Sequence, residues 1–186
     1  MTKPHKYLAI AYLLLWVWII LFCPPTYAQL RISQPPTATA KVIRVLDGDT
    51  FEVIQNLQKV RWRISGIDAP ELKQPFGQQS ADSLTKILIN RTITVQLLGK
   101  DLFQRDIINV THIQGKRCDL DSLIIANGWA WSQKGWYANV YYLHRDPIQS
   151  IAVTQKRGIW QCDTPVIPKM WRRLNAHNKR LANNCN

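Results

Sequence analysis

Two short acidic segments carry the residues with the clearest chemical potential in this chain. The first, VLDGDTFEV (45–53), places Asp47 and Asp49 on either side of a glycine between apolar residues. The second, RISGIDAPE, ends with Asp68 and Glu71. Each segment alone is typical of a turn, because Asp, Gly and Pro favour turns. If the strands that carry the two turns are neighbours, the turns meet and form a site rich in carboxylate oxygens.

The residue types in these segments favour a hard metal ion and a phosphate. Carboxylates without histidine or thiolate suit Ca²⁺ or Mg²⁺ better than zinc. Arg63 precedes Asp68 by five residues, and a guanidinium beside metal-bound carboxylates can clamp a phosphate through paired N–H donors. Arg105, at the start of a later strand, is a second candidate. For Gly48 we expect a tight turn with positive φ, which glycine adopts at no steric cost.

The net charge and the N-terminal segment limit what the 186-residue chain can bind and where it acts. Its formal net charge is +12. Residues 1–28 have the features of an export signal: Lys3 and Lys6 precede the apolar run 8–23, and Thr-Tyr-Ala ends at Ala28. An uncleaved membrane anchor is the alternative, although the run is shorter than the roughly 20 residues of a typical span. Cleavage would remove two positive charges and leave +10, which favours a polyanionic partner such as nucleic acid.

Three cysteines would remain after cleavage, namely Cys118, Cys162 and Cys185. In an oxidising compartment two of them are expected to pair. A Cys162–Cys185 bridge across the C-terminal tail is the first choice, and a Cys118–Cys162 bridge is the open alternative.

The hydrophobic pattern indicates a small barrel with helices. Strands are predicted at 40–46, 50–55, 59–67, 92–98 and 107–113, and helices at 76–90, 119–127 and 148–156. This order lacks a βαβ alternation, so we expect an α+β, mainly β fold: a five-stranded oligonucleotide-binding (OB) barrel with about three helices, after an N-terminal hydrophobic helix. The predicted regions are a signal (1–28), a linker (29–38), the barrel domain (39–161) and a basic C-terminal extension (162–186).

Five segments in this order resemble the staphylococcal nuclease (thermonuclease) family, over about residues 39–161. They are VIRVLDGDTFEV, RISGIDAPE, DLFQRDIINV, LIIANGWAW and QKRGIWQ. The resemblance implies a calcium-dependent endonuclease that hydrolyses phosphodiester bonds of DNA and RNA with little sequence specificity. It implies Ca²⁺ ligands at Asp49, Asp68 and the backbone carbonyl of Ala69. It implies catalytic roles for Arg63, Glu71 and Arg105, with Glu71 acting on the attacking water.

The chain departs from the family pattern just before Arg105. The family usually has Tyr-Gly-Arg there, whereas this chain has Phe103-Gln104-Arg105. Phe103 is expected to line the nucleotide pocket without a hydroxyl, and Gln104 changes the backbone freedom of the turn. Many members also have Thr where this chain has Ala69.

An aromatic cluster between residues 129 and 142 allows two interpretations. Trp131 and Tyr137 are candidates for stacking on bases, and packing in the core and at its rim is the alternative. Trp62 is expected in the core.

Two other functions use part of the same pattern. One is a catalytically weak or inactive nucleic-acid-binding OB module, and the other is a membrane-anchored polyanion-binding protein. The presence of all five side chains of the family site favours the enzyme. We expect a secreted or periplasmic monomer that acts on DNA and RNA without an obligate protein partner, and membrane contact only if the N-terminal segment stays uncleaved.

Overall fold

The computed structural model describes residues 11–18, 35–133 and 145–182. The chain divides into two units, Met1–Gln34 and Pro35–Asn186. In the first unit, residues 11–18 are helical, and the predicted cleavage point after Ala28 lies outside the described residues. Within the described ranges, no helix is both long enough and apolar enough to cross a membrane.

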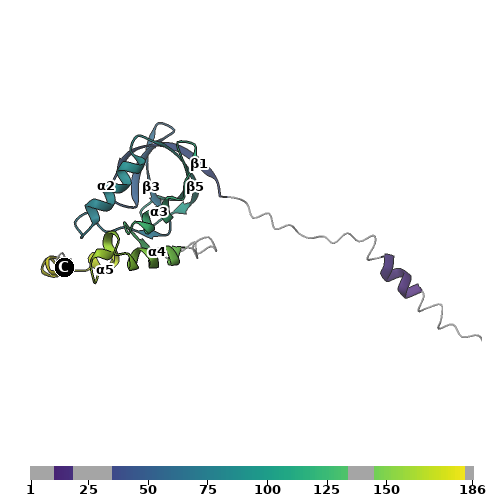
Figure 1. Ribbon diagram of the computed structural model, residues 1–186. Helices are drawn as coiled ribbons and strands as arrows, with labels where there is room; N and C mark the ends of the chain where they lie inside the picture. The colour runs from purple at the N-terminus through teal and green to yellow at the C-terminus, as the bar shows by residue number, and fades with distance from the viewer. Residues whose placement is uncertain (1–10, 19–34, 134–144, 183–186) are drawn as a thin grey trace, which may run out of the picture. The chain divides into compact units, whose positions relative to one another are not determined.

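Five strands of the second unit close into a barrel, which confirms the predicted fold (Figure 1). They are β1 (Thr37–Val45), β2 (Thr50–Gln55), β3 (Gln58–Ile64), β5 (Thr92–Lys100) and β6 (Asp106–Ile113). Hydrogen-bonded neighbours follow the order β3-β2-β1-β5-β6, and a parallel pairing of β3 with β6 closes the ring. The other barrel pairings are antiparallel.

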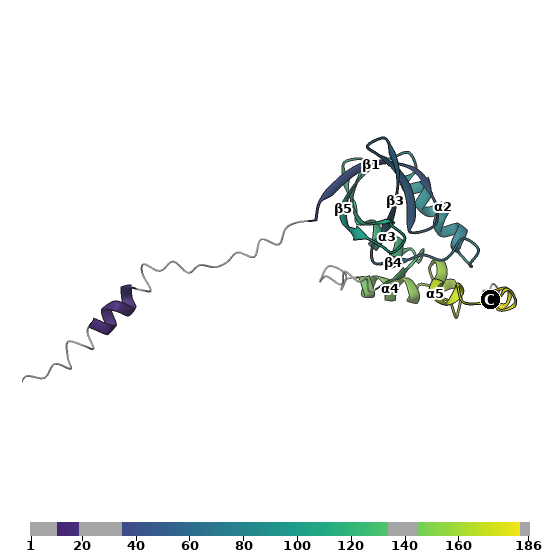
Figure 2. The same ribbon diagram turned by 180° about the vertical axis from the view of Figure 1, so that it is seen from behind.

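Short strands and helices surround the barrel. The short strands are β4 (Ile67–Asp68), β7 (Lys116–Arg117) and β8 (Trp131–Ser132). The helical segments are α2 (Gly77–Leu88), α3 (Leu120–Ala126), α4 (Arg145–Thr154), η2 (Gly158–Gln161), α5 (Pro168–Trp171) and α6 (Ala176–Ala182). Both views place α3, α4 and α5 on the same side of the barrel (Figures 1 and 2). The three predicted helices correspond to α2, α3 and α4, whereas α5 and α6 lie in the extension, where none was predicted.

Two of the predicted boundaries that differ from the structure have a clear cause. β1 begins at Thr37, inside the segment expected as linker (29–38), because residues 37–41 pair with β5. The strand predicted at 59–67 ends at Ile64, since Gly66 adopts a φ of 71°. The chain turns there and resumes as β4, which pairs with β8 instead of the barrel.

The core fills the barrel and the space beneath the helices. Phe51 and Trp62 are fully buried and meet edge to face, with ring centroids 6.3 Å apart. The expectation that Trp62 is a core residue is therefore confirmed. The helix α2 contributes Leu84 and Leu88 to the same core, as its helical spacing of apolar residues predicted.

The cysteines fall into two states. Cys162 is disulfide-bonded, and Cys118 is a free thiol. The alternative Cys118–Cys162 bridge is therefore wrong. Cys185 lies outside the described residues, so the Cys162–Cys185 bridge stays a prediction.

Candidate functional site

The β2–β3 hairpin fixes the register of the first two site residues. Asn56 and Leu57 connect the strands with φ of 49° and 62°, the left-handed conformations of a two-residue type I′ turn. This turn sets Thr50 opposite Arg63, and the backbone N–H of Ile64 donates to the carbonyl of Asp49 at 2.9 Å. Asp49 therefore lies beside the end of β3, next to the guanidinium of Arg63.

The loop between β1 and β2 is a turn, as predicted, but Gly48 serves it for a different reason. The carboxylate of Asp47 accepts bonds from the backbone N–H groups of Asp49 and Thr50 at 3.0 and 2.7 Å. Gly48 does not have the positive φ that we expected. A Cβ there would lie 2.0 Å from the Ser80 hydroxyl oxygen, so the residue must be glycine because α2 packs directly against it.

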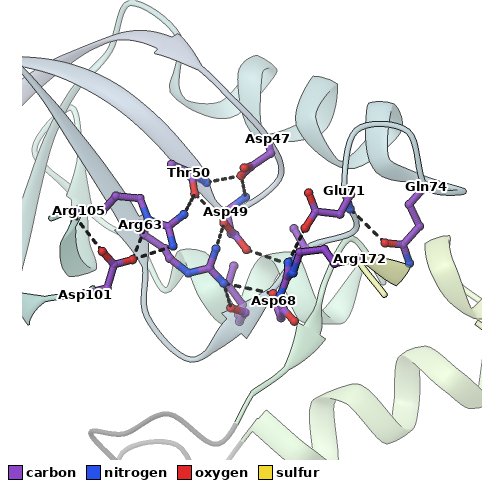
Figure 3. Close-up of polar contacts among 12 residues, drawn as sticks. Asp47, Asp49, Thr50, Arg63, Asp68, Glu71, Gln74, Asp101, Arg105 and Arg172 are labelled. Atoms are coloured by element: carbon purple, nitrogen blue, oxygen red, sulfur yellow. Dashed lines mark hydrogen bonds and ion pairs between the residues drawn. The ribbon is translucent and has the colours of Figure 1, made fainter. Parts of the chain in front are cut away.

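Asp49 is the centre of the site, with 2% of its surface exposed. One carboxylate oxygen accepts from the Thr50 hydroxyl at 2.8 Å and from Arg63 Nη1 at 2.5 Å. The other accepts from the backbone N–H of Ala69 at 2.9 Å. This last bond joins the two acidic turns, which confirms that they meet (Figure 3).

Arg63 bridges the two predicted metal-binding carboxylates. Its Nη1 donates to Asp49, and its Nη2 donates to Asp68 at 3.2 Å. Burial alone would lower the pKa of Arg63, but the negative charges of Asp49, Asp68 and Asp47 raise it. The guanidinium is thus held in place from both sides by carboxylate groups.

Burial and the charge of neighbouring carboxylates raise the pKa of two acids of the site. Burial, followed by the charge of Asp49, raises the pKa of Asp47 to about 7. Burial and the charge of Asp49 also raise the pKa of Asp68, against the opposing charges of Arg63 and Arg172. A divalent cation would relieve this repulsion.

The donor set at the meeting point of the turns fits a hard cation. Asp49 and Asp68 offer carboxylate oxygens, and Ala69 offers its carbonyl. Across the ranges that the structure describes, no group of three or more His, Cys, Asp or Glu residues is close enough to hold a metal. Ca²⁺ and Mg²⁺ can be coordinated by two carboxylates when carbonyl, water or substrate oxygens fill the other coordination positions.

Arg105 reaches the same site from the turn between β5 and β6. The carboxylate of Asp101 accepts its backbone N–H at 3.0 Å and its Nε at 2.7 Å, and Arg105 Nη1 lies 3.4 Å from the Thr50 hydroxyl. Gln104 has a φ of 58°, so this chain places a side chain where glycine would be unstrained. Phe103 is 79% exposed, and its ring centroid lies 5.4 Å from Arg105 Cζ.

Glu71 lies on the turn after β4 and makes contacts that the sequence did not suggest. Its backbone N–H donates to the side chain of Gln74 at 3.2 Å, and Gln74 in turn donates to the carbonyl of Val166. Its carboxylate forms an ion pair with Arg172, just after α5 (Figure 3). Arg172 comes from about a hundred residues further along the chain.

Sequence reasoning missed Thr50, Asp101 and Arg172. Asp101 stands four residues before Arg105, a spacing that could have suggested the pair. For Arg172 the available signal was a C-terminal tail rich in basic residues.

The structure describes only one of the two predicted stacking residues. Trp131 is 8% exposed, and its ring packs edge to face against Trp160 with centroids 6.0 Å apart. This burial favours the packing interpretation at Trp131, while stacking on a base stays a prediction. Tyr137 lies outside the described residues.

The comparisons with known proteins agree with this geometry. The family model described as "Staphylococcal nuclease homologue" matches residues 61–162. An "Uncharacterized endonuclease" of Escherichia coli O157:H7 is 35% identical over 136 residues, 71% of this chain and 83% of that protein. An "Uncharacterized endonuclease" of Haemophilus influenzae is 31% identical over 141 residues, 75% and 76% of the two chains. The "Micrococcal nuclease" of Shigella flexneri is 25% identical over 165 residues, 86% and 90% of the two chains.

The fold is an OB-like barrel, and two carboxylates and two guanidiniums gather at one edge of it. The chain belongs to the staphylococcal nuclease family, which confirms the resemblance seen in the sequence.

Proposed function

We propose that this protein is a Ca²⁺-dependent endonuclease that hydrolyses phosphodiester bonds of DNA and RNA. The observation that carries the proposal is one connected series of contacts at the barrel's edge. Arg105 contacts Thr50, Thr50 donates to Asp49, and Arg63 joins Asp49 to Asp68. Two cationic side chains and two carboxylates thus lie within one hydrogen-bonded unit, which can bind a phosphodiester and stabilise the negative charge that develops during its hydrolysis.

Asp49, Asp68 and the carbonyl of Ala69 are the residues that would hold Ca²⁺. When bound, the ion supplies positive charge to the phosphate and lowers the pKa of a coordinated water. The raised pKa of Asp68 supports the assignment, because a carboxylate that repels its neighbour gains most from a cation.

The remaining groups have roles that follow from charge. Attack of water on a phosphodiester adds negative charge to the oxygens around phosphorus. Arg63 and Arg105 would donate N–H groups to those oxygens, and Glu71 would accept the proton of the attacking water. Thr50 would help to hold both arginines in place. Its hydroxyl donates to Asp49, which binds Arg63, and it accepts from Arg105.

The proposed substrate range follows from what these groups can recognise. Guanidinium and carboxylate groups address the phosphate, which is identical in every nucleotide and carries no sequence information. Cleavage of both DNA and RNA with little sequence specificity is therefore expected. For the location we propose export through the N-terminal signal, with cleavage after Ala28, to a secreted or periplasmic site.

A cleavage assay tests the activity. The purified protein is incubated with plasmid DNA and with RNA, in Ca²⁺ or in EGTA, beside Glu71→Gln. We expect fragments of both substrates in Ca²⁺, almost none in EGTA, restoration when Ca²⁺ is added back, and strong loss in Glu71→Gln. Full cleavage in EGTA would contradict the calcium requirement.

The same assay separates the alternatives. An inactive binding module would retard both nucleic acids on a gel in Ca²⁺ without cutting them. N-terminal sequencing of the exported protein distinguishes cleavage after Ala28 from a retained anchor.

A further inference from the structure

The C-terminal extension lies against the site instead of trailing away from it. Trp171 of α5 is 3% exposed, and the side chain of Gln74 donates to the carbonyl of Val166. Lys179 of α6 lies 5.6 Å from the centroid of the Trp171 ring. The extension is therefore anchored to the barrel at the turn that carries Glu71.

A cleft of about 390 Å³ separates the extension from the barrel. Asp47 and Glu71 line its barrel side, and Arg172 and Lys179 line the side of the extension. Lys73, two residues after Glu71, adds a third cation to the lining. The lining of the cleft thus combines the predicted catalytic carboxylate with three cationic side chains.

The extension is strongly basic. Residues 164–182 contain five Lys or Arg residues and no Asp or Glu. The two of them that line the cleft, Arg172 and Lys179, lie beside the predicted catalytic carboxylate, where they can attract the backbone of a nucleic acid strand.

The ion pair between Arg172 and Glu71 is of a kind that exchanges partners readily. The side chains are 56% and 40% exposed, and exposed pairs contribute only about 0–1 kcal/mol to stability. Arg63, by contrast, is 18% exposed and bound to two carboxylates. Arg172 is therefore the arginine that can leave its carboxylate for a phosphate at small cost.

We propose that Arg172, Lys73 and Lys179 form a subsite for a backbone phosphate of the nucleic acid strand, adjacent to the phosphodiester that is cut. Arg172 binds Glu71 in the free protein and releases it when this phosphate enters. The inference rests on the proposed function, because it assigns a place to a neighbouring nucleotide of the same substrate.

Binding measurements test the subsite without catalysis. Anisotropy of a labelled single-stranded DNA oligonucleotide, in EGTA, gives Kd between about 50 and 200 mM salt. Each cation removed in Arg172→Ala or in Lys73→Ala/Lys179→Ala is expected to lower the slope of log Kd against log salt by about 0.7. The matched control is Lys169→Ala, which removes an exposed charge of α5 outside the cleft and is expected to leave the slope unchanged.

A second readout compares substrates. The measured quantity is kcat/KM for the oligonucleotide divided by kcat/KM for bis(p-nitrophenyl) phosphate, which has a single phosphate and cannot reach the subsite. We expect this ratio to fall roughly tenfold in Lys73→Ala/Lys179→Ala, because the variant weakens contacts to a second phosphate. Lys169→Ala is expected to keep the wild-type ratio.

The outcomes distinguish the two proposals. If the wild type cuts nucleic acid but the cleft variants match Lys169→Ala in both slope and ratio, the subsite is wrong and the nuclease stands. If the wild type does not cut, the proposed function fails, and the salt slopes still decide whether the cleft binds phosphate.

Discussion

The two predicted catalytic arginines are held in opposite ways. Arg63 lies at the end of a barrel strand, where β2 and β6 flank β3 and where the carboxylates of Asp49 and Asp68 bind its guanidinium. Arg105 follows a turn and is bound by a single carboxylate, Asp101, from the same turn. Long-range pairing positions the first, and a local five-residue segment positions the second.

The two arginines therefore depend on different parts of the structure for their placement. The placement of Arg63 depends on the closed barrel and on the packing of α2 over the DGD loop, so it is coupled to global stability. The placement of Arg105 depends on Asp101 and on a strained backbone at Gln104, so it can be altered without disturbing the barrel. Substitutions around each arginine test this contrast.

Arg63→Ala is expected to have the largest effect on activity. Loss of one preorganised donor to the phosphate typically lowers the rate on the order of 10²–10³-fold, and here it also leaves Asp49 and Asp68 without their shared counter-charge. Cleavage kinetics and thermal unfolding of the same samples measure both losses. Arg117→Ala, an exposed strand arginine, is the control and should keep wild-type activity; equal activity in the two variants would exclude Arg63 from the site.

Gly48→Ala tests the packing that holds Asp49. The added Cβ would lie 2.0 Å from the Ser80 hydroxyl oxygen and 2.7 Å from the Ala69 Cβ, and such overpacking typically costs about 1–3 kcal/mol. A fall in the free energy of unfolding, measured in urea, is expected together with weaker activity. The control repeats Gly48→Ala in a Ser80→Gly background, which removes the hydroxyl oxygen and the Cβ that would lie 2.0 and 2.9 Å from the added Cβ. The substitution should cost less there than in the wild type, and an equal cost in both backgrounds would contradict the packing argument.

Asp101→Ala tests the local support of Arg105. The variant removes the acceptor of both the backbone N–H and the Nε of Arg105, so the side chain loses its orientation while its charge remains. We expect kcat/KM to fall roughly tenfold, less than after removal of a donor itself, with a small change in stability. Asp82→Ala, on the exposed face of α2, should change neither. If Asp101→Ala lowered the unfolding midpoint as far as Gly48→Ala does, the claim that this turn can be altered without disturbing the barrel would be wrong.

Gln104→Gly should have the smallest effect. A left-handed residue with a Cβ costs about 1–2 kcal/mol, and glycine recovers part of this against its larger entropy loss on folding. We expect a gain of about 0.5 kcal/mol in the free energy of unfolding and less than a twofold change in kcat/KM. Gln114→Gly, at φ 49° in the β6–β7 turn, is the matched control. A destabilised Gln104→Gly beside a stabilised Gln114→Gly would show that the Gln104 side chain has another role.

Much of the site could be predicted because it is encoded locally. The alternation of apolar residues located the strands, and the acidic turns followed from their ends. The contact of the two turns through Asp49 and Ala69 was foreseeable because consecutive antiparallel strands usually pair. The role of Gly48 was misjudged, since its neighbour Ser80 belongs to a helix some thirty residues later and φ preference was the only signal available locally.

The sequence by itself determined the class of this protein: its strand and helix order, its two acidic turns and its two arginines. Only the tertiary structure decided what surrounds them. The DGD loop requires glycine because α2 packs on it, Trp131 is buried against Trp160, and Arg172 reaches Glu71 from the C-terminal extension. These features depend on which distant surfaces meet when the chain buries its apolar residues, whereas the spacing of residues within a segment reports only local geometry.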